Sequence, residues 1–300
     1  MNLVPLYLTG PTASGKSALA IELAEKLGGE IVNADAFQLY SGLDICTAKP
    51  RREDLARVPH HLYSILPPTE LCDAQFFCDL AQPVMADIAS RGKLPIVVGG
   101  SGLYVKALTH GLSPLPADEG LRERLAQLTA AERVAWLLQR DPAADETINL
   151  KNDRYVTRAL EICILTGQPQ SELRKSWSQV PPSLRGLCLV WERPALDARI
   201  DQRTHDMIAA GLVEEIATLP PLSPTADKAI GVREIRAHLA GETSLEDAIA
   251  AMQLATRQYA RRQEKWFRRE HWLQQVAVRQ GAPMAQLLAR AMEALGPLAP

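Results

Sequence analysis

The chain has 300 residues, of which 47% are hydrophobic and 23% are charged, and its formal net charge is −2. This composition is ordinary for a globular protein, and the length allows roughly two domains or one large domain with an insertion. No apolar run approaches the ~20 residues that cross a bilayer. The near-neutral charge means that any surface for nucleic acid must be local.

The five cysteines are scattered, and none of them forms a CxxC pair. Neither the cysteines nor the six histidines have the spacing of a zinc site. The first residues are predicted to enter a strand directly, so we expect no signal peptide. Reduced cysteines without a targeting segment predict a cytoplasmic protein with no membrane partner, and we expect a monomer.

Residues 10–17 read GPTASGKS and match the P-loop pattern G-x-x-x-x-G-K-[ST]. The motif has its required context, because residues 3–9 predict a short buried strand and residues 17–27 predict a helix. Backbone N–H groups and the helix dipole of such a loop hold phosphates, Lys16 would reach them, and the Ser17 hydroxyl would bind Mg²⁺. The predicted cradle for a diphosphate or nucleotide comprises Gly10, Pro11, Thr12, Ala13, Ser14, Gly15, Lys16 and Ser17.

A carboxylate follows the next predicted strand, which covers residues 30–34 and ends at Asp35. Because the carboxyl ends of strands line the ligand crevice of open α/β sheets, Asp35 would lie beside the P-loop. A third strand, over residues 94–98, ends in Gly99 and Gly100, where P-loop kinases and NTPases usually place an Asp that helps to hold Mg²⁺. The missing Asp counts against those two activities.

The remaining chain predicts mostly helices. Asp73 can cap a helix that runs to about residue 91, with a kink or a break at Pro83. A short strand is predicted over residues 61–65, another over 187–191, and a helix over about 195–219. A basic helix follows over 255–270, and the tail beyond residue 278 reads as helical.

Residues 113–185 show helical periodicity with few strand signals. They predict a helical insertion between two parts of one core, residues 1–112 and residues 186–300. The predicted fold is therefore α/β, with a P-loop NTPase-like parallel sheet core and a helical insertion domain.

Several motifs in one order carry a more specific pattern. GPTASGKS, NADAFQLYSGLDICTAKP at residues 33–50 and VVGGSGLYVKAL at residues 97–108 together resemble the tRNA dimethylallyltransferases. The resemblance continues through NDRYVTRALEI, RIDQRTHDMIAAGLVEEI, AIGVRE and TRQYARRQEKWFRR, and covers residues 6 to about 269. It implies transfer of a dimethylallyl group from dimethylallyl diphosphate to the exocyclic amine of the adenosine on the 3′ side of a tRNA anticodon.

The resemblance also implies catalytic residues. Asp35 would orient the amine and take its proton, as a carboxylate within hydrogen-bonding reach can do. In the family an arginine of the RIDQRTHDM helix contacts the diphosphate, which points to Arg199 or Arg203, one turn apart. Ser101 stands where the family usually has Thr, close to the reacting base.

The implied partner is the anticodon stem-loop of tRNA, whose target base must be splayed out into a pocket. The family usually has Ser and Met at Ala36 and Phe37, and Gly at Cys46, so these contacts depart from its pattern. Arginines interleaved with aromatic residues on the basic helix can grip an RNA backbone, whereas we assign the aromatic residues to the core. The expected tRNA-binding residues are Asp35, Ala36, Phe37, Gln38, Ser101, Arg122, Arg154, Tyr155, Val156, Thr157, Arg158, Arg233, Arg261 and Arg262.

Three alternatives stay open at this point. A prenyltransferase acting on free AMP or ADP would use the same phosphate loop, but it would need neither the insertion nor the basic helix. A small-molecule kinase lacks its usual carboxylate after residue 98. An RNA-binding NTPase without group transfer would be distinguished by its ATPase activity.

Overall fold

The computed structural model describes residues 4–111, 116–177 and 184–296. The chain forms two compact units, one of residues 1–109 with 182–300 and the other of residues 110–181. The expected insertion, 113–185, begins outside the described residues, and its last residue, Arg185, is already the first residue of a strand.

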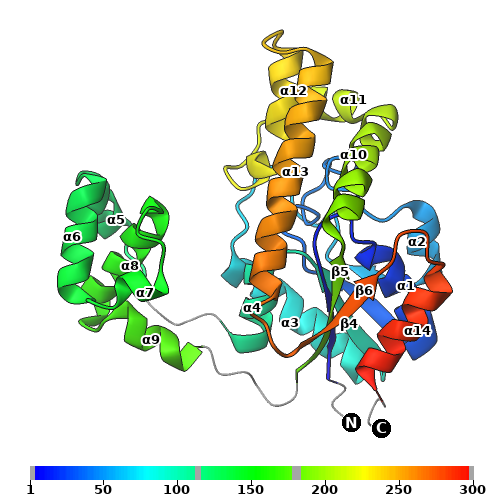
Figure 1. Cartoon of the computed structure of the whole chain (residues 1–300), viewed down its shortest axis with the longest axis horizontal. Helices are drawn as coiled ribbons and strands as arrows, with labels where there is room; N and C mark the ends of the chain where they lie inside the picture. Colours follow the sequence, from blue (N-terminus) through cyan, green and yellow to red (C-terminus); the bar gives the residue numbers. More distant parts are fainter. Residues whose placement is uncertain (1–3, 112–115, 178–183, 297–300) are drawn as a thin grey trace. The chain divides into compact units, whose positions relative to one another are not determined.

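The larger unit is built on a parallel sheet with the order β3-β2-β4-β1-β5-β6 in the described part of the chain. Figure 1 labels three of its strands, β4, β5 and β6. Its strands are β1 (Leu6–Thr9), β2 (Gly29–Asn33), β3 (His60–His61), β4 (Leu94–Gly99), β5 (Arg185–Trp191) and β6 (Leu273–Val278). The first strand is central, since Leu6 pairs with Ile96 of β4 and with Arg185 of β5. All carboxyl ends therefore meet at one edge of the sheet, as predicted for an α/β protein of this class.

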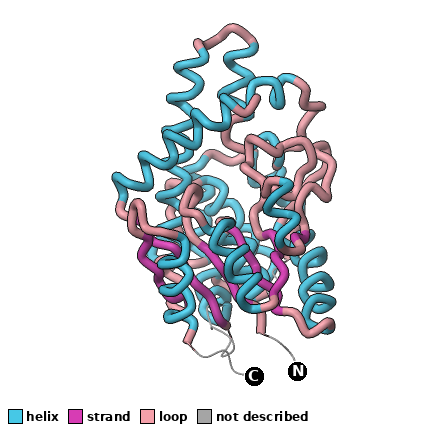
Figure 2. Tube along the Cα trace, turned by 90° about the vertical axis from the view of Figure 1, so that its right-hand side faces the viewer, coloured by secondary structure: helices cyan, strands magenta, loops and turns pink. Residues whose placement is uncertain are grey.

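Helices flank the strands on both sides (Figure 2). In the larger unit they are α1 (Lys16–Leu27), α2 (Arg52–Arg57), α3 (Ala74–Ser90), α4 (Gly102–His110), α10 (Arg193–Ala209), α11 (Leu212–Ala217), α12 (Val232–Leu239), α13 (Leu245–Phe267) and α14 (Met284–Leu295), with a 3₁₀ turn at Ala226–Lys228. The smaller unit contains α5 (Glu119–Ala126), α6 (Ala130–Arg140), α7 (Ala144–Thr147), α8 (Asp153–Thr166) and α9 (Gln170–Trp177). No helix within the described ranges is long and apolar enough to cross a membrane.

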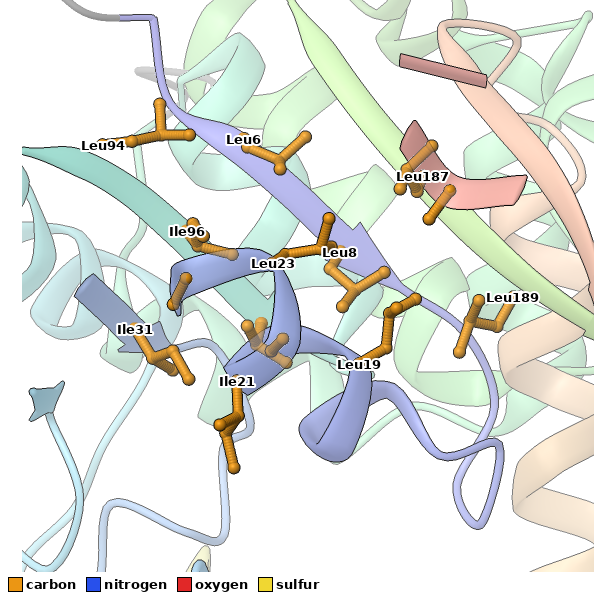
Figure 3. Packing of buried hydrophobic residues seen from close by; sticks show 14 of the residues in the cluster. Leu6, Leu8, Leu19, Ile21, Leu23, Ile31, Leu94, Ile96, Leu187 and Leu189 are labelled. Atoms are coloured by element: carbon orange, nitrogen blue, oxygen red, sulfur yellow. The ribbon is translucent and has the colours of Figure 1, made fainter. Parts of the chain in front are cut away.

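The core holds the P-loop helix against the sheet (Figure 3). Leu19 and Leu23 of α1 are fully buried in one cluster with Leu6 and Leu8 of β1. Burial of each such leucine contributes about 1.5–3 kcal/mol. Successive strand side chains point to opposite faces, so Tyr7 faces the other layer, where α3 packs on β2 and β4. The loop between β1 and α1 is thus anchored at both ends.

Two predicted helices differ from the structure. Helix α3 continues through Pro83 without a break. Pro83 and Asp79 are both exposed, so water can satisfy the Asp79 carbonyl that loses its N–H partner. The helix expected over 195–219 is two helices, because Gly211 takes a φ of 98° between α10 and α11.

Two strands also differ. β3 has only two residues instead of the five expected, because the backbone turns at Leu62 and Ser64, which have φ angles of 64° and 52°. β6 was not predicted, and it extends the sheet beyond β5 through pairs such as Gly186 with Leu273. The basic helix begins ten residues earlier than expected, since α13 starts at Leu245.

Candidate active site

The P-loop is fixed from outside through its carbonyl groups. The indole of Trp191 donates to the Ser14 carbonyl at 2.9 Å, and Arg199 Nε donates to the Ala13 carbonyl at 3.0 Å. Helix α1 begins at Lys16, directly after Gly15, whose φ is 88°. The N–H groups of its first turn have no intrahelical partner and form a binding site for an anion.

Lys16 lies in this loop and is strongly affected by its surroundings. Burial lowers the pKa of Lys16 to about 8, while Asp35 opposes the shift and Arg203 adds to it. A bound diphosphate favours the protonated amine. Below pH 8, Lys16 is already charged in the free protein. Above pH 8 the amine is largely neutral, so diphosphate binding must be accompanied by uptake of a proton.

We expect the affinity for inorganic diphosphate to fall about tenfold per pH unit above pH 8, because one pKa unit corresponds to a tenfold change. Isothermal titration between pH 7 and pH 9 measures this dependence. A Lys16→Arg variant is the control, since its guanidinium stays charged throughout. An equal loss of affinity in both proteins would show that Lys16 does not titrate in this range.

The Asp35 turn is built by its own side chains. Asn33 Oδ1 accepts from the Asp35 backbone N–H at 2.8 Å, and Asp35 Oδ1 accepts from the Phe37 N–H at 3.1 Å. Ser101, after β4, accepts from the Ala36 N–H at 3.0 Å. The loops after β2 and β4 are thus joined, and Ser101 holds the backbone beside Asp35.

A cavity of about 70 Å³ brings the expected elements together. Thr12 of the P-loop, Asp35, Arg203 of α10 and Tyr259 of α13 all line it. Its apolar lining includes Ile200, Met207, Ile230 and Met252. A phosphate loop, a carboxylate and an apolar wall around one small space suit an apolar group carried on a diphosphate.

The two candidate arginines lie on different sides of the P-loop. Arg203 lines the cavity, with one guanidinium nitrogen 3.4 Å from the Thr12 hydroxyl, and burial lowers its pKa while Asp35 opposes the shift. Arg199 is exposed, with its guanidinium 4.8 Å from the centre of the Trp191 ring. Asp201, a possible partner for this pair, instead binds Arg257 at 2.8 Å.

Helix α13 supplies two residues that sequence reasoning missed. Tyr259, assigned to the core with the other aromatic residues, lines the cavity, and burial together with Asp35 raises its pKa well above the usual range. Gln263 is buried, and its side-chain oxygen accepts a hydrogen bond from the Thr12 N–H of the P-loop. Their i, i+4 spacing on a basic helix was the available signal. Phe267 is a core residue as expected.

The expected RNA-binding residues of the larger unit differ in exposure and in contacts. Arg261 and Arg262 are exposed on α13, and Arg233 is 88% exposed on α12. Phe37 lines the cavity. The Gln38 amide instead donates to two loop carbonyls, those of residues 47 and 48, at 2.9 and 3.2 Å.

The smaller unit carries the other expected RNA contacts. Arg122 and Arg158 both pair with the buried carboxylate of Glu161, at 2.9 and 2.6 Å. Arg154 and Tyr155 are exposed. A pocket of about 560 Å³ in this unit is lined by Arg122, Arg154, Thr157 and Arg158. Val156 is 1% exposed, so its side chain belongs to the core of the unit.

The donor set at the P-loop fits a magnesium ion that is bound largely through the substrate. Ser17 is exposed in the first turn of α1. No cluster of three His, Cys, Asp or Glu side chains suited to a metal occurs within the described ranges. Mg²⁺ retains several waters and commonly binds substrate phosphates rather than an all-protein cage. The Ser17 hydroxyl can complete such a site.

Comparisons with known proteins identify relatives of this chain. The family model described as IPP transferase matches residues 38–270, and the one described as Isopentenyl transferase matches residues 4–63. A protein of Akkermansia muciniphila named tRNA dimethylallyltransferase is 44% identical, over 97% of this chain and 99% of its own. Another with this name, from Geobacter metallireducens, is 46% identical over 88% and 89%.

Solved structures show the same relationship. The tRNA isopentenylpyrophosphate transferase of Bacillus halodurans superposes with a TM-score of 0.69 at 32% identity, covering 98% of this chain and 97% of its own. A eukaryotic dimethylallyltransferase acting on tRNA gives a TM-score of 0.75 at 27% identity, over 92% and 74%. The resemblance of the motifs is confirmed, and the chain belongs to the IPP transferase family, together with proteins named tRNA dimethylallyltransferases.

Proposed function

We propose that this protein transfers a dimethylallyl group from dimethylallyl diphosphate to the exocyclic amine of the adenosine on the 3′ side of a tRNA anticodon. The observation that carries the proposal is the cavity in which the P-loop, Asp35 and Arg203 meet. The absence of a carboxylate after β4, which ends at Gly99, favours this reaction over phosphoryl transfer. We also propose that the protein acts as a monomer in the cytoplasm.

The leaving diphosphate gains negative charge as the bond between carbon and oxygen breaks. Positive groups fixed in advance at that place are usually the largest catalytic contribution. The N–H groups of the P-loop, the ammonium of Lys16 and the guanidinium of Arg203 would bind the diphosphate. The Ser17 hydroxyl would help to hold Mg²⁺, which would supply further charge neutralisation.

The acceptor amine is a weak nucleophile because its lone pair is delocalised into the adenine ring. Asp35 Oδ1 is occupied by the Phe37 N–H, whereas no hydrogen-bond partner of Oδ2 is found among the described residues. Oδ2 can therefore accept a proton from the amine as the new bond between carbon and nitrogen forms. Tyr259 and Phe37 offer aromatic faces along the same cavity.

The basic face of α13 would bind the RNA backbone. Reversing the charge of Arg261 and Arg262 to Glu should weaken tRNA binding, most strongly at low salt. For each RNA phosphate that the variant no longer neutralises, the slope of log K against log salt should become shallower by about 0.7–0.9. Fluorescence anisotropy with a labelled anticodon stem-loop at several salt concentrations measures both the affinity and the slope.

Lys93→Glu provides the matched control, because Lys93 is exposed just before β4, at the opposite edge of the sheet. It should leave the salt slope unchanged. If the double variant also kept the wild-type affinity and slope, α13 would not be the RNA surface.

A comparison of two acceptors tests the proposed reaction. Purified protein with Mg²⁺ and dimethylallyl diphosphate is given unmodified tRNA in one reaction and AMP in another, and the nucleosides are read by mass spectrometry. We expect prenylated adenosine from tRNA alone. Prenylated AMP alone would show that the protein acts on free nucleotides. If neither acceptor were prenylated, hydrolysis of ATP in a separate reaction would support the NTPase alternative.

A further inference from the structure

Gln263 is a buried amide, 4% exposed, on the inward side of α13. Its Oε1 accepts from the Thr12 backbone N–H at 2.8 Å, and its Nε2 donates to the Gly100 carbonyl at 2.9 Å. Thr12 belongs to the P-loop after β1, and Gly100 belongs to the turn after β4. One side chain therefore joins two loops that are remote in sequence.

The contact continues to the catalytic carboxylate. Gly100 leaves room for the amide, since a Cβ there would lie 2.1 Å from Gln263 Nε2. The next residue, Ser101, accepts from the Ala36 N–H, which is adjacent to Asp35. Gln263 thus fixes the P-loop on one side and, through Ser101, the Asp35 turn on the other.

We propose that Gln263 is a positioning residue that sets the distance between the donor diphosphate on the P-loop and the carboxylate of Asp35. The proposal rests on the proposed function, in which both substrates must be held in reactive geometry. A displacement of about 1 Å from that geometry can cost about 10²-fold in rate. Gln263 itself touches neither substrate in this account, so it acts through Thr12 and Ser101.

The chemistry of the two contacts makes the amide hard to replace. Thr12 presents a donor and Gly100 presents an acceptor, so the side chain must accept at one atom and donate at the other. A neutral amide does this, and so does a protonated carboxyl group. An ionised carboxylate only accepts and would repel the Gly100 carbonyl. A leucine would leave the half-buried Thr12 N–H and the buried Gly100 carbonyl without this partner.

Two substitutions separate positioning from simple packing. Once its carboxyl group is ionised, Gln263→Glu should lower kcat by about 10²-fold, with the KM values for donor and tRNA little changed. As the pH falls, protonation of the new carboxyl group should restore the donor, so the ratio of variant to wild-type kcat should rise. Gln263→Leu should also lower kcat, and its ratio of variant to wild-type kcat should not change with pH.

The ratio of variant to wild-type kcat cancels the pH dependence that arises from ionisable groups present in both proteins. The side chain of Tyr259 on α13 hydrogen-bonds with that of Gln263, and, besides burial, Asp35 after β2 and Arg262 on α13 also affect the pKa of Tyr259. Lys16 in the P-loop and Arg203 on α10 interact with Asp35 in turn. Gln82, exposed on α3, provides the control, and Gln82→Glu should keep the wild-type kcat and pH profile. Thermal unfolding of every variant is measured alongside.

Three results would overturn the proposal. These are a wild-type kcat in Gln263→Glu at every pH, including pH values at which the new carboxyl group is ionised, a loss in that variant that does not depend on pH, and a loss that unfolding fully explains. A wild-type protein that transfers no prenyl group would instead refute the proposed function, independently of Gln263.

Discussion

Replacing Asp35 by Asn should lower the rate of prenyl transfer by about 10²–10⁴-fold, the usual contribution of a general base. The amide keeps the size of the side chain, and it can still accept from the Phe37 N–H, as Oδ1 does at 3.1 Å. It cannot take a proton from the adenine amine. The affinity for tRNA should therefore stay close to that of the wild type, and the loss should lie in the chemical step. Single-turnover transfer with saturating protein measures that step directly.

Asp44→Asn is the matched control for this experiment. Asp44 follows the same strand, but its side chain is 62% exposed and pairs with Lys49. Its substitution should leave the rate unchanged. If Asp35→Asn lost tRNA affinity in parallel with the rate, Asp35 would bind the base without activating it.

Arg203→Met should lower transfer by about 10²–10³-fold, a loss typical of removing one group that stabilises developing charge. The guanidinium lines the cavity 3.4 Å from the Thr12 hydroxyl, on the side where the diphosphate would leave. The affinity for inorganic diphosphate should fall as well, because in the proposed reaction the same group would bind the product. Transfer kinetics and isothermal titration with diphosphate measure the two effects separately.

Arg199→Met tests whether the two arginines differ in role. Arg199 lies one turn away, on the Trp191 ring, and it donates a hydrogen bond to the Ala13 carbonyl of the P-loop. It is not among the residues that line the cavity. Its loss should have a much smaller effect on both measurements. An effect of Arg199→Met equal to or larger than that of Arg203→Met would reverse this assignment.

Much of the fold could be predicted because its signals are local. The glycine spacing of the P-loop, the buried run before it and the helix after it all lie within one short stretch. β6 has no such signal. The sequence LQQVAV does not alternate regularly between apolar and polar residues, and the strand depends on pairing with β5, which is remote in sequence.

The candidate site shows the same division. Asp35 could be placed beside the P-loop because both follow parallel strands, whose carboxyl ends share one edge. Arg199 and Arg203 could not be told apart from the sequence, since their one-turn spacing does not say which guanidinium lines the cavity. The role of Gln263 depends on its distances to Thr12 and Gly100, which no local pattern encodes.

The proposed reaction can be tested by locating the transferred group on the RNA. The protein is incubated with Mg²⁺, deuterated dimethylallyl diphosphate and one unmodified tRNA, and the ribonuclease fragments are sequenced by mass spectrometry. We expect the label on a single adenosine, the one on the 3′ side of the anticodon, at the same rate in the wild type and in Asp44→Asn and about 10²–10⁴-fold more slowly in Asp35→Asn. A label at another nucleotide, or no label from folded wild-type protein, would contradict the proposed reaction.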